Sequence, residues 1–208
     1  MVTAAPVSPP APPHLSDDAW AGLPEDEPGE LVGGVLVEEE VADWIHETAV
    51  GWLIQLFRAW AIPRGGRVAA SELKYLLGKG RGRKPDVSVL LAGSKPPPGR
   101  GAMRRPADIM IEVVSPSSRD VRRDRLEKRA EYAMFGVRWY WLLEPATRML
   151  EIYELGPDGR YVVVLGAEDG RIDAVPGCEG LVLNLDELWS EIEGLGEEEA
   201  AQPEENES

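Results

Sequence analysis

The chain has 208 residues, of which 43% are hydrophobic and 28% are charged, and its formal net charge is −15. This length and composition are typical of one globular domain with tails rather than of a disordered protein. One cysteine and two histidines argue against an internal disulfide, a cysteine zinc cluster and a histidine-rich metal site, so a metal site would consist mainly of carboxylates. No apolar run reaches the roughly 18 residues that cross a bilayer, and there is no secretory signal. We therefore expect a cytoplasmic protein without a membrane partner.

The charge is unevenly distributed along the chain. Residues 1–28 contain five acidic residues and no Lys or Arg, and residues 190–208 contain eight acidic residues and no Lys or Arg. By contrast, residues 64–129 contain 17 basic and 7 acidic residues. A basic centre between acidic ends is compatible with binding a polyanion such as nucleic acid, but basic residues that only solvate loops and helices give the same count.

The composition divides the chain into three parts. We expect residues 1–28 to be a flexible, Pro-rich acidic leader, in which Trp20 could dock through a short turn capped by Ser16. We expect residues 29–193 to form the domain and residues 194–208 to be a disordered acidic tail.

The first elements of the domain are a strand pair and a long helix. Glu30–Val37 contains Gly33-Gly34 between short apolar runs, which predicts a β-hairpin. Apolar residues then recur at steps of three and four over residues 38–61, which predicts an amphipathic helix. Pro63 and the glycines after it end this helix.

Short strands and two further helices follow. We predict helices at residues 117–135, after the break at Ser115-Pro116-Ser117, and at residues 185–193. The predicted strands are Val68–Leu77, Val87–Leu91, Ile109–Val114, Trp139–Leu143, Leu150–Tyr153 and Tyr161–Leu165. This order predicts an α/β or α+β domain with a mixed central β-sheet flanked by helices and with extra antiparallel strands.

Two carboxylates lie on neighbouring predicted strands. Asp86 follows Pro85 at the start of one strand, and Glu112 lies in the middle of a strongly apolar one. The period of two places Glu112 on one face with Asp108, Met110 and Val114. A glutamate among Ile and Val needs a cation, an arginine or a metal as partner if it is buried. An edge strand that exposes Glu112 to water, and a turn role for Asp86, remain alternatives.

A lysine lies in the apolar stripe of the predicted helix 117–135. The residues that share this helix face are Val121, Asp124, Lys128, Tyr132 and Phe135. Lys128 could also be a lysine that extends its amine to solvent at the edge of the stripe. Two carboxylates with a nearby lysine can hold a divalent cation, which polarises a phosphoryl oxygen and activates water, while the lysine stabilises the developing charge.

These residues resemble a nuclease family. Pro85-Asp86, followed after 25 residues by Glu112, is similar to the PD-(D/E)XK nuclease pattern. The longer ordered set resembles the Uma-type restriction endonucleases over roughly residues 29–189: Pro85-Asp86-Val87, Ile111-Glu112-Val113-Val114-Ser115-Pro116-Ser117-Ser118, Lys128, Tyr132, Gly136-Val137, Tyr140-Trp141-Leu142-Leu143 and Pro145.

The resemblance implies a restriction-endonuclease-like fold and a Mg²⁺-dependent endonuclease that acts on DNA, with Mn²⁺ as a possible substitute. Asp86 and Glu112 would be the metal ligands and, with Lys128, the catalytic residues. The superfamily usually has a lysine two residues after the glutamate, where this chain has Val114, so the resemblance assigns that role to Lys128. It also makes Glu72, His46 and Glu47 auxiliary candidates, and a solvated helix face is the alternative for Glu47.

Other features are weaker indications. The basic segment Gly78–Arg83 predicts a flexible hairpin loop, and Lys79, Arg81, Arg83 and Lys84 are its candidates for contacting a nucleic acid backbone. The aromatic run Trp139-Tyr140-Trp141 favours core packing over base stacking, and Cys178 lies in a turn-like segment without a neighbouring base.

Three functions therefore remain open from the sequence. The first is a metal-dependent DNA endonuclease, the second a non-catalytic module that binds nucleic acid or protein, and the third a phosphodiesterase that acts on RNA or a nucleotide. A homodimer or higher homo-oligomer is expected, because cutting both strands of a duplex is simplest with two sites related by two-fold symmetry.

Overall fold

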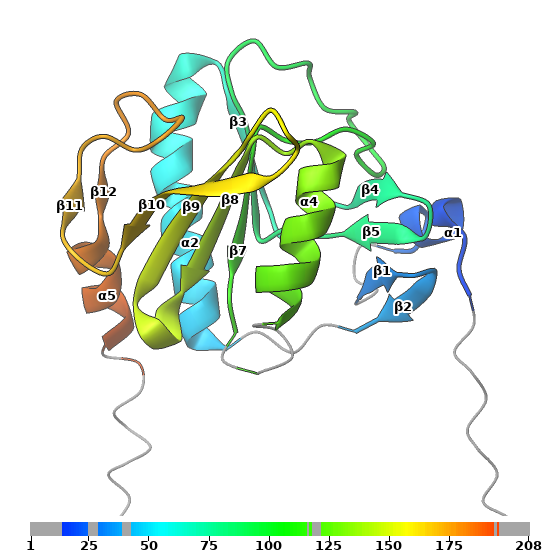
Figure 1. The fold of residues 1–208 in the computed structure, drawn as a ribbon, viewed down its shortest axis with the longest axis horizontal. Helices are drawn as coiled ribbons and strands as arrows, with labels where there is room; N and C mark the ends of the chain where they lie inside the picture. The colour runs from blue at the N-terminus through cyan, green and yellow to red at the C-terminus, as the bar shows by residue number, and fades with distance from the viewer. Residues whose placement is uncertain are drawn as a thin grey trace, which may run out of the picture.

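The centre of the molecule is a six-stranded mixed β-sheet in the order β10-β9-β8-β7-β6-β3 (Figure 1). The computed structural model describes residues 14–24, 29–38, 43–115, 117, 122–193 and 195. The strands of this sheet are β3 (Arg67–Ala70), β6 (Val87–Leu90), β7 (Ile109–Val113), β8 (Trp139–Glu144), β9 (Met149–Leu155) and β10 (Tyr161–Ala167). Strands β7 and β8 are parallel, and all other neighbours in this sheet are antiparallel. The mixed sheet predicted from the sequence is confirmed.

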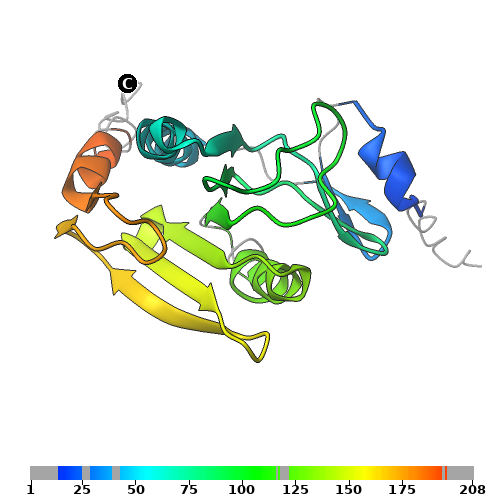
Figure 2. The ribbon, with the colours of Figure 1, turned by 90° about the horizontal axis from the view of Figure 1, so that it is seen from above.

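Helices cover both faces of this sheet (Figure 2). On one face lie α2 (Trp44–Ala61) and α5 (Leu185–Glu193), and on the other lies α4 (Arg129–Phe135). The side chain of Asp43 accepts a hydrogen bond from the His46 N–H and so caps α2. Short 3₁₀ turns follow α2 and β8, namely η1 (Ile62–Arg64) and η3 (Pro145–Thr147). The predicted helix over residues 38–61 thus begins at Trp44 in the structure, and residues 39–42 lie outside the described residues.

The predicted helix over residues 117–135 contains an irregular turn. Its first part, η2 (Arg123–Lys128), is a π-helix, and it continues directly into α4. Single π-helical turns inside helices often occur at functional sites, and this one ends at Lys128. Residues 116 and 118–121, which include part of the predicted capping segment, lie outside the described residues.

A second, four-stranded sheet lies beside the main one (Figure 1). Its order is β2-β1-β5-β4, with strands β1 (Glu30–Val32), β2 (Val35–Val37), β4 (Tyr75–Gly78) and β5 (Arg81–Arg83). The predicted hairpin over Glu30–Val37 is therefore confirmed. A hairpin at Gly78–Arg83 is confirmed too, but Arg81–Arg83 form strand β5 rather than part of a loop. The prediction of one strand over Val68–Leu77 is wrong, because β3 and β4 belong to different sheets and a turn separates them. The segment contains no glycine or proline before residue 78, so its composition does not mark the break.

Part of the predicted leader packs onto the small sheet. The helix α1 (Asp17–Ala21) begins after Ser16, whose hydroxyl accepts a hydrogen bond from the Ala19 N–H. Trp20 is fully buried with Leu31 and Leu76. The docking of Trp20 and the Ser16 cap are confirmed, and the domain limits at residues 29 and 193 stay a prediction.

The two faces of β7 belong to different cores. Ile109, Ile111 and Val113 pack against the α2 side, in the same cluster as Trp141. Met110, Val114 and Glu112 are all buried, and the first two pack with Tyr132 and Tyr140 on the α4 side. The predicted alternation along this strand is confirmed, as is core packing of the run Trp139-Tyr140-Trp141.

Smaller elements complete the fold. Strands β11 (Arg171–Ile172) and β12 (Leu183–Asn184) pair with each other beside α5. Among the helices of the described segments, none is both long and apolar enough to span a membrane.

Candidate active site

The ends of two neighbouring strands bring Asp86 and Glu112 together. The antiparallel register pairs Val87 with Ile111, so Asp86 lies at the end of β6 next to Glu112 of β7. The Oδ2 atom of Asp86 accepts a hydrogen bond of 2.7 Å from the Val113 N–H, which fixes the carboxylate against β7. Pro85 precedes the strand, where its missing N–H leaves no gap in the ladder.

The helix supplies two partners for Glu112. Lys128 Nζ lies 2.8 Å from one carboxylate oxygen, and the Tyr132 hydroxyl donates a hydrogen bond of 2.5 Å to the other. Glu112 is 1% exposed and Lys128 is 2% exposed, so neither is a surface residue. The need of Glu112 for a cation is therefore met within the chain, and Lys128 does not extend to solvent.

Lys128 contacts three carboxylates rather than one. Its Nζ lies 3.5 Å from Asp124 Oδ1 and 3.4 Å from Glu30 Oε1, in addition to the contact with Glu112. Asp124 is in the helix one turn earlier, as the predicted stripe requires, and is also buried. The lysine is thus the centre of a buried charged cluster formed by β1, β7 and the helix.

Glu30 is a member of this cluster that the sequence analysis missed. Strand β1 pairs with β5, and Arg83 Nη1 donates a 2.7 Å hydrogen bond to Glu30 Oε2. The backbone N–H of Lys84 donates to the other oxygen of Glu30 at 2.9 Å, and Arg83 Nε reaches Glu131 at 2.7 Å. Glu30 is a charged residue in a short strand that is otherwise apolar, Leu31 and Val32 being its other members. A charged residue in an apolar strand is also the feature of the sequence that indicated Glu112.

Burial and the neighbouring charges together perturb the pKa values of the carboxyl groups in this cluster. Burial, together with the charges of Asp86, Asp124 and Glu30, holds the pKa of Glu112 well above its ordinary value despite the attraction of Lys128. Burial likewise raises the pKa of Asp124, although Lys128 opposes it. Burial alone would raise the pKa of Glu30, but Lys128 and Arg83 outweigh it and lower the pKa.

Of the three auxiliary candidates, His46 contacts Asp86 directly, whereas Glu47 and Glu72 have exposed side chains. His46 Nε2 lies 3.4 Å from Asp86 Oδ2. Burial opposes protonation of this histidine, but the hydrogen bond and charge of Asp86 raise its pKa. Glu47 is exposed and lies 3.7 Å from the other ring nitrogen of His46. Glu72 is exposed and pairs with Lys84 Nζ at 2.9 Å.

The four basic candidates do not form one exposed loop. Arg83 is fully buried and Lys84 is 5% exposed, and both are paired with glutamates, so neither is free to contact a phosphate. Lys79 is exposed and Arg81 is half-buried at the hairpin tip, where the Gly80 N–H bonds to Asp17 of α1. Two of the four predicted contact residues are therefore buried: Arg83 pairs with the buried Glu30, and Lys84 pairs with the exposed Glu72.

Other charges of the basic segment are also paired within the chain. Arg125 contacts Glu144 and Glu151, and Arg104 contacts Asp18 at 2.6 Å. Lys74 Nζ donates to the Leu23 carbonyl at 2.7 Å. The excess of basic residues between 64 and 129 therefore does not translate directly into a basic surface.

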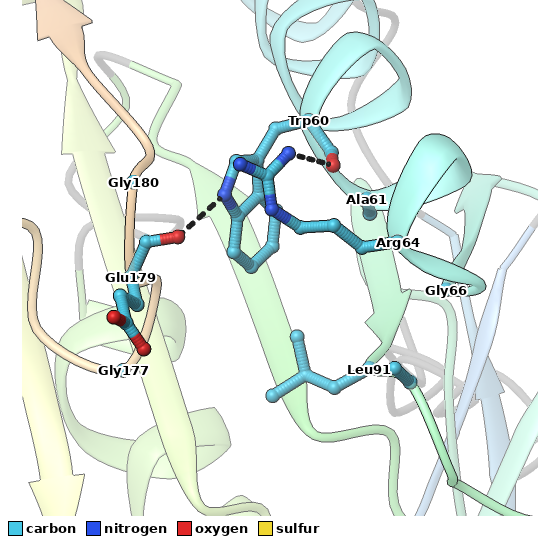
Figure 3. A pocket seen from close by; sticks show the side chains of 9 residues that line it. Trp60, Ala61, Arg64, Gly66, Leu91, Gly177, Glu179 and Gly180 are labelled. Carbon is cyan, nitrogen blue, oxygen red and sulfur yellow. Dashed lines mark hydrogen bonds between the residues drawn. The ribbon is translucent and has the colours of Figure 1, made fainter.

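Two cavities have different relations to this site. A cavity of about 100 Å³ adjoins it and is lined by Asp43, Ile45, His46, Val114, Ser115, Pro145, Ala146 and Ile192. A cavity of about 510 Å³ lies at the other end of α2, where Arg64 stacks over Trp60 and the Trp60 indole donates to the Glu179 carbonyl (Figure 3). The second cavity contains none of the candidate catalytic residues.

The carboxylates at the site are of the ligand type that a hard divalent cation prefers. Glu30, Glu112 and Asp124 contact Lys128, and Asp86 lies beside Glu112 at the end of the neighbouring strand. Burial, and then the charges of Asp86, Asp124 and Glu30, raise the pKa of Glu112. Carboxylate oxygens are the ligands that Mg²⁺ and Mn²⁺ prefer. Both oxygens of Glu112 already accept hydrogen bonds, and within the described segments no three His, Cys, Asp or Glu side chains are arranged to hold a metal ion.

Comparisons with known proteins identify the family and the fold. The Uma2 family, described as "Putative restriction endonuclease", matches residues 18–186. The crystal structure of a "putative nuclease belonging to DUF820" from Anabaena variabilis is similar with a TM-score of 0.67 and 21% identity, and covers 86% of this chain and 99% of that chain. No match exists among the curated proteins compared. The structural likeness shows a shared nuclease-like fold, and because the family match spans most of the sequence, the chain belongs to the Uma2 family.

Proposed function

We propose that this protein is a metal-dependent endonuclease that hydrolyses phosphodiester bonds of DNA, with Asp86, Glu112 and Lys128 as its catalytic residues. The observation that carries the proposal is the 2.8 Å contact between Lys128 and Glu112 inside a buried cluster rich in carboxylates. Buried charge of this kind stabilises a fold poorly compared with hydrocarbon, so a chemical role explains it better than a structural one.

Asp86 and Glu112 would hold Mg²⁺, and Mn²⁺ could replace it. When bound, such a cation supplies Lewis acidity and lowers the pKa of a coordinated water. Asp86 is oriented by the Val113 N–H and by His46. The side chains of Asp86 and His46 are 15% and 14% exposed, so substrate would approach from their side of the cluster rather than from Glu112.

Lys128 would take the place of the lysine that the strand lacks at Val114. Its ammonium is held by Glu112 and Asp124, both of them buried. An ammonium fixed in this way can stabilise the negative charge that develops on a phosphoryl group, or orient the attacking water, without reorganising during the reaction.

The competing function is a non-catalytic module that binds nucleic acid or protein. The observation in its favour is that both oxygens of Glu112 are already engaged by Lys128 and Tyr132. In that case Lys128 and Tyr132 would occupy the carboxylate oxygens of Glu112 in place of a metal ion. The two functions differ in whether the folded protein binds metal and cleaves a phosphodiester.

The decisive experiment compares the wild type with Asp86→Asn, Glu112→Gln, Lys128→Met and the control Glu187→Gln, an exposed carboxylate of α5. Each protein is titrated with Mn²⁺ and Mg²⁺ by calorimetry and assayed on supercoiled plasmid, single-stranded DNA and RNA. We expect the wild type and the control to bind metal and cleave DNA, Lys128→Met to bind metal with cleavage reduced at least about 100-fold, and the two carboxylate variants to lose both.

A folded wild type that neither binds metal nor cleaves any substrate would favour the binding module. Cleavage of RNA alone would keep the chemistry and change the substrate.

A further inference from the structure

Strand β10 is an open edge of the main sheet. The strand order ends at β10, and within the described residues no backbone hydrogen bond joins Tyr161–Ala167 to any strand other than β9. Figure 2 shows the β9–β10 hairpin at the outer margin of the sheet. One row of backbone N–H and C=O groups is therefore available to another strand.

The side chains of β10 include no charge and no proline, although the strand has a register irregularity between Val163 and Leu165. Val162, Val163 and Val164 are 58%, 52% and 40% exposed, whereas Leu165 is partly buried and packs against the main core. All seven residues from Tyr161 to Ala167 are uncharged, and none is proline. In natural proteins a lysine, a proline or a covering element commonly prevents an edge strand from pairing with another chain. An exposed apolar edge strand favours such pairing.

Charges at the two ends of β10 suit pairing with an identical strand. Arg160 precedes the strand and Glu168 follows it, each four residues from Val164. Both are exposed, and neither forms an ion pair with another described residue. In an antiparallel pair centred near Val164, each Arg160 would face Glu168 of the second copy. A strand with this arrangement is complementary to itself.

We propose that β10 pairs antiparallel with β10 of a second copy across a two-fold axis, which joins the two six-stranded sheets into one continuous sheet. The contact satisfies the open backbone groups and buries the three valines of each copy. The irregularity between Val163 and Leu165 bends the strand, and it sets which valines lie nearest the axis.

The first test is the mass of the protein in solution, measured by light scattering after size exclusion over a range of concentrations. We expect a dimer for the wild type and a dissociation constant at least about tenfold weaker for Val163→Lys, because a lysine would have to lose its hydration in the contact. Ile62→Lys is the matched control, since Ile62 is also an exposed apolar residue but belongs to η1. It should leave the dimer unchanged.

A second test does not depend on how Val163→Lys folds. Arg160→Glu should weaken the dimer about fivefold, because it places like charges opposite each other, and the double variant Arg160→Glu/Glu168→Arg should restore it. Both sites are exposed, so the fold should tolerate these changes.

A monomeric wild type at about 100 µM protein, where a dimer with a dissociation constant of about 10 µM would be mostly associated, would overturn the proposal. A dimer that neither Val163→Lys nor Arg160→Glu weakens would overturn it as well, since the contact would then lie elsewhere.

Discussion

The two faces of strand β7 are equally buried but for different reasons. On the α2 side, Ile111 packs among hydrocarbon side chains, and burial alone makes this arrangement favourable. On the α4 side, Glu112 is buried only because Lys128, Tyr132 and their neighbours come from other elements to meet its charge. The first face needs only the right hydropathy, whereas the second needs named partners in fixed positions. We therefore interpret the first face as the source of stability and the second as the source of function.

The largest effect is expected where the polar face loses a counter-charge. Glu30→Ala would leave the fully buried Arg83 with Glu131 as its remaining partner, so the free energy of unfolding should fall by about 3–5 kcal/mol. Urea denaturation measures this loss.

The matched double variant is Glu30→Leu/Arg83→Met, which replaces both charges by hydrocarbon. It should recover most of the stability, because a buried ion pair is often no more stable than well-packed apolar residues. If Glu30→Ala lowered the free energy of unfolding by less than about 1 kcal/mol, the ion pair would contribute no more than an exposed one, and the contrast between the two faces would not hold.

Substitutions on the apolar face of β7 should lower the stability of the protein and leave metal binding unchanged. Ile111→Ala should lower the free energy of unfolding by about 2–5 kcal/mol through the cavity it creates, and Ile111→Val by about 0.5–1.5 kcal/mol. Metal affinity at 10 °C, measured on the folded fraction, should stay at the wild-type value for both variants. Loss of metal binding in a folded Ile111→Val protein would contradict this division.

A smaller effect follows from the pKa of Glu112. This pKa is raised mainly by burial and then by the nearby carboxylates. In the unfolded chain Glu112 loses its proton near its ordinary pKa of 4.5, whereas in the folded state it keeps the proton to a higher pH. Stability should therefore fall as the pH rises from that value through the raised pKa, by up to about 1.4 kcal/mol per pH unit. Glu112→Gln should reduce this slope and leave the part that the raised pKa values of Asp124 and His46 contribute, whereas Glu187→Gln should retain the whole slope.

The dependence of the free energy of unfolding on pH should be measured above about pH 5, where the lowered pKa of Glu30 does not contribute. The pKa of Glu30 is lowered, so its contribution is present above the ordinary value of 4.5 and is lost only as the pH falls below that value. A wild type whose stability rises steadily between about pH 5 and pH 8 would show that Glu112 is ionised at little cost.

The smallest effect concerns Cys178, which belongs to the apolar face. Burial raises the pKa of this thiol to about 12, so at pH 8 only about 0.01% is thiolate. The native protein should react with iodoacetamide far more slowly than the urea-unfolded chain, as mass spectrometry of the alkylated protein would show. Equal rates in the two states would indicate that this core opens readily.

Local spacing in the sequence was enough to predict several parts of the site. The period of two along β7 placed Glu112 opposite the apolar face, and the steps of three and four along the helix placed Asp124, Lys128 and Tyr132 on one side. These relations depend only on the geometry of a strand and of a helix, so they survive folding unchanged. The Asp86 and Glu112 pair also followed from two strands that are close in sequence order.

The tertiary structure decided which charges meet across long distances in the chain. Pairing of β1 with β5 brings Glu30 to Arg83, and docking of the helix brings Lys128 to Glu30. No local pattern determines such contacts, because they depend on which strands pair and on how a helix packs. For the same reason the sequence showed Arg83 and Lys84 as a basic loop, whereas the fold uses them as buried counter-charges. Sequence by itself thus determined which residues share a face, and only the packing of distant elements determined which charges are left for a substrate.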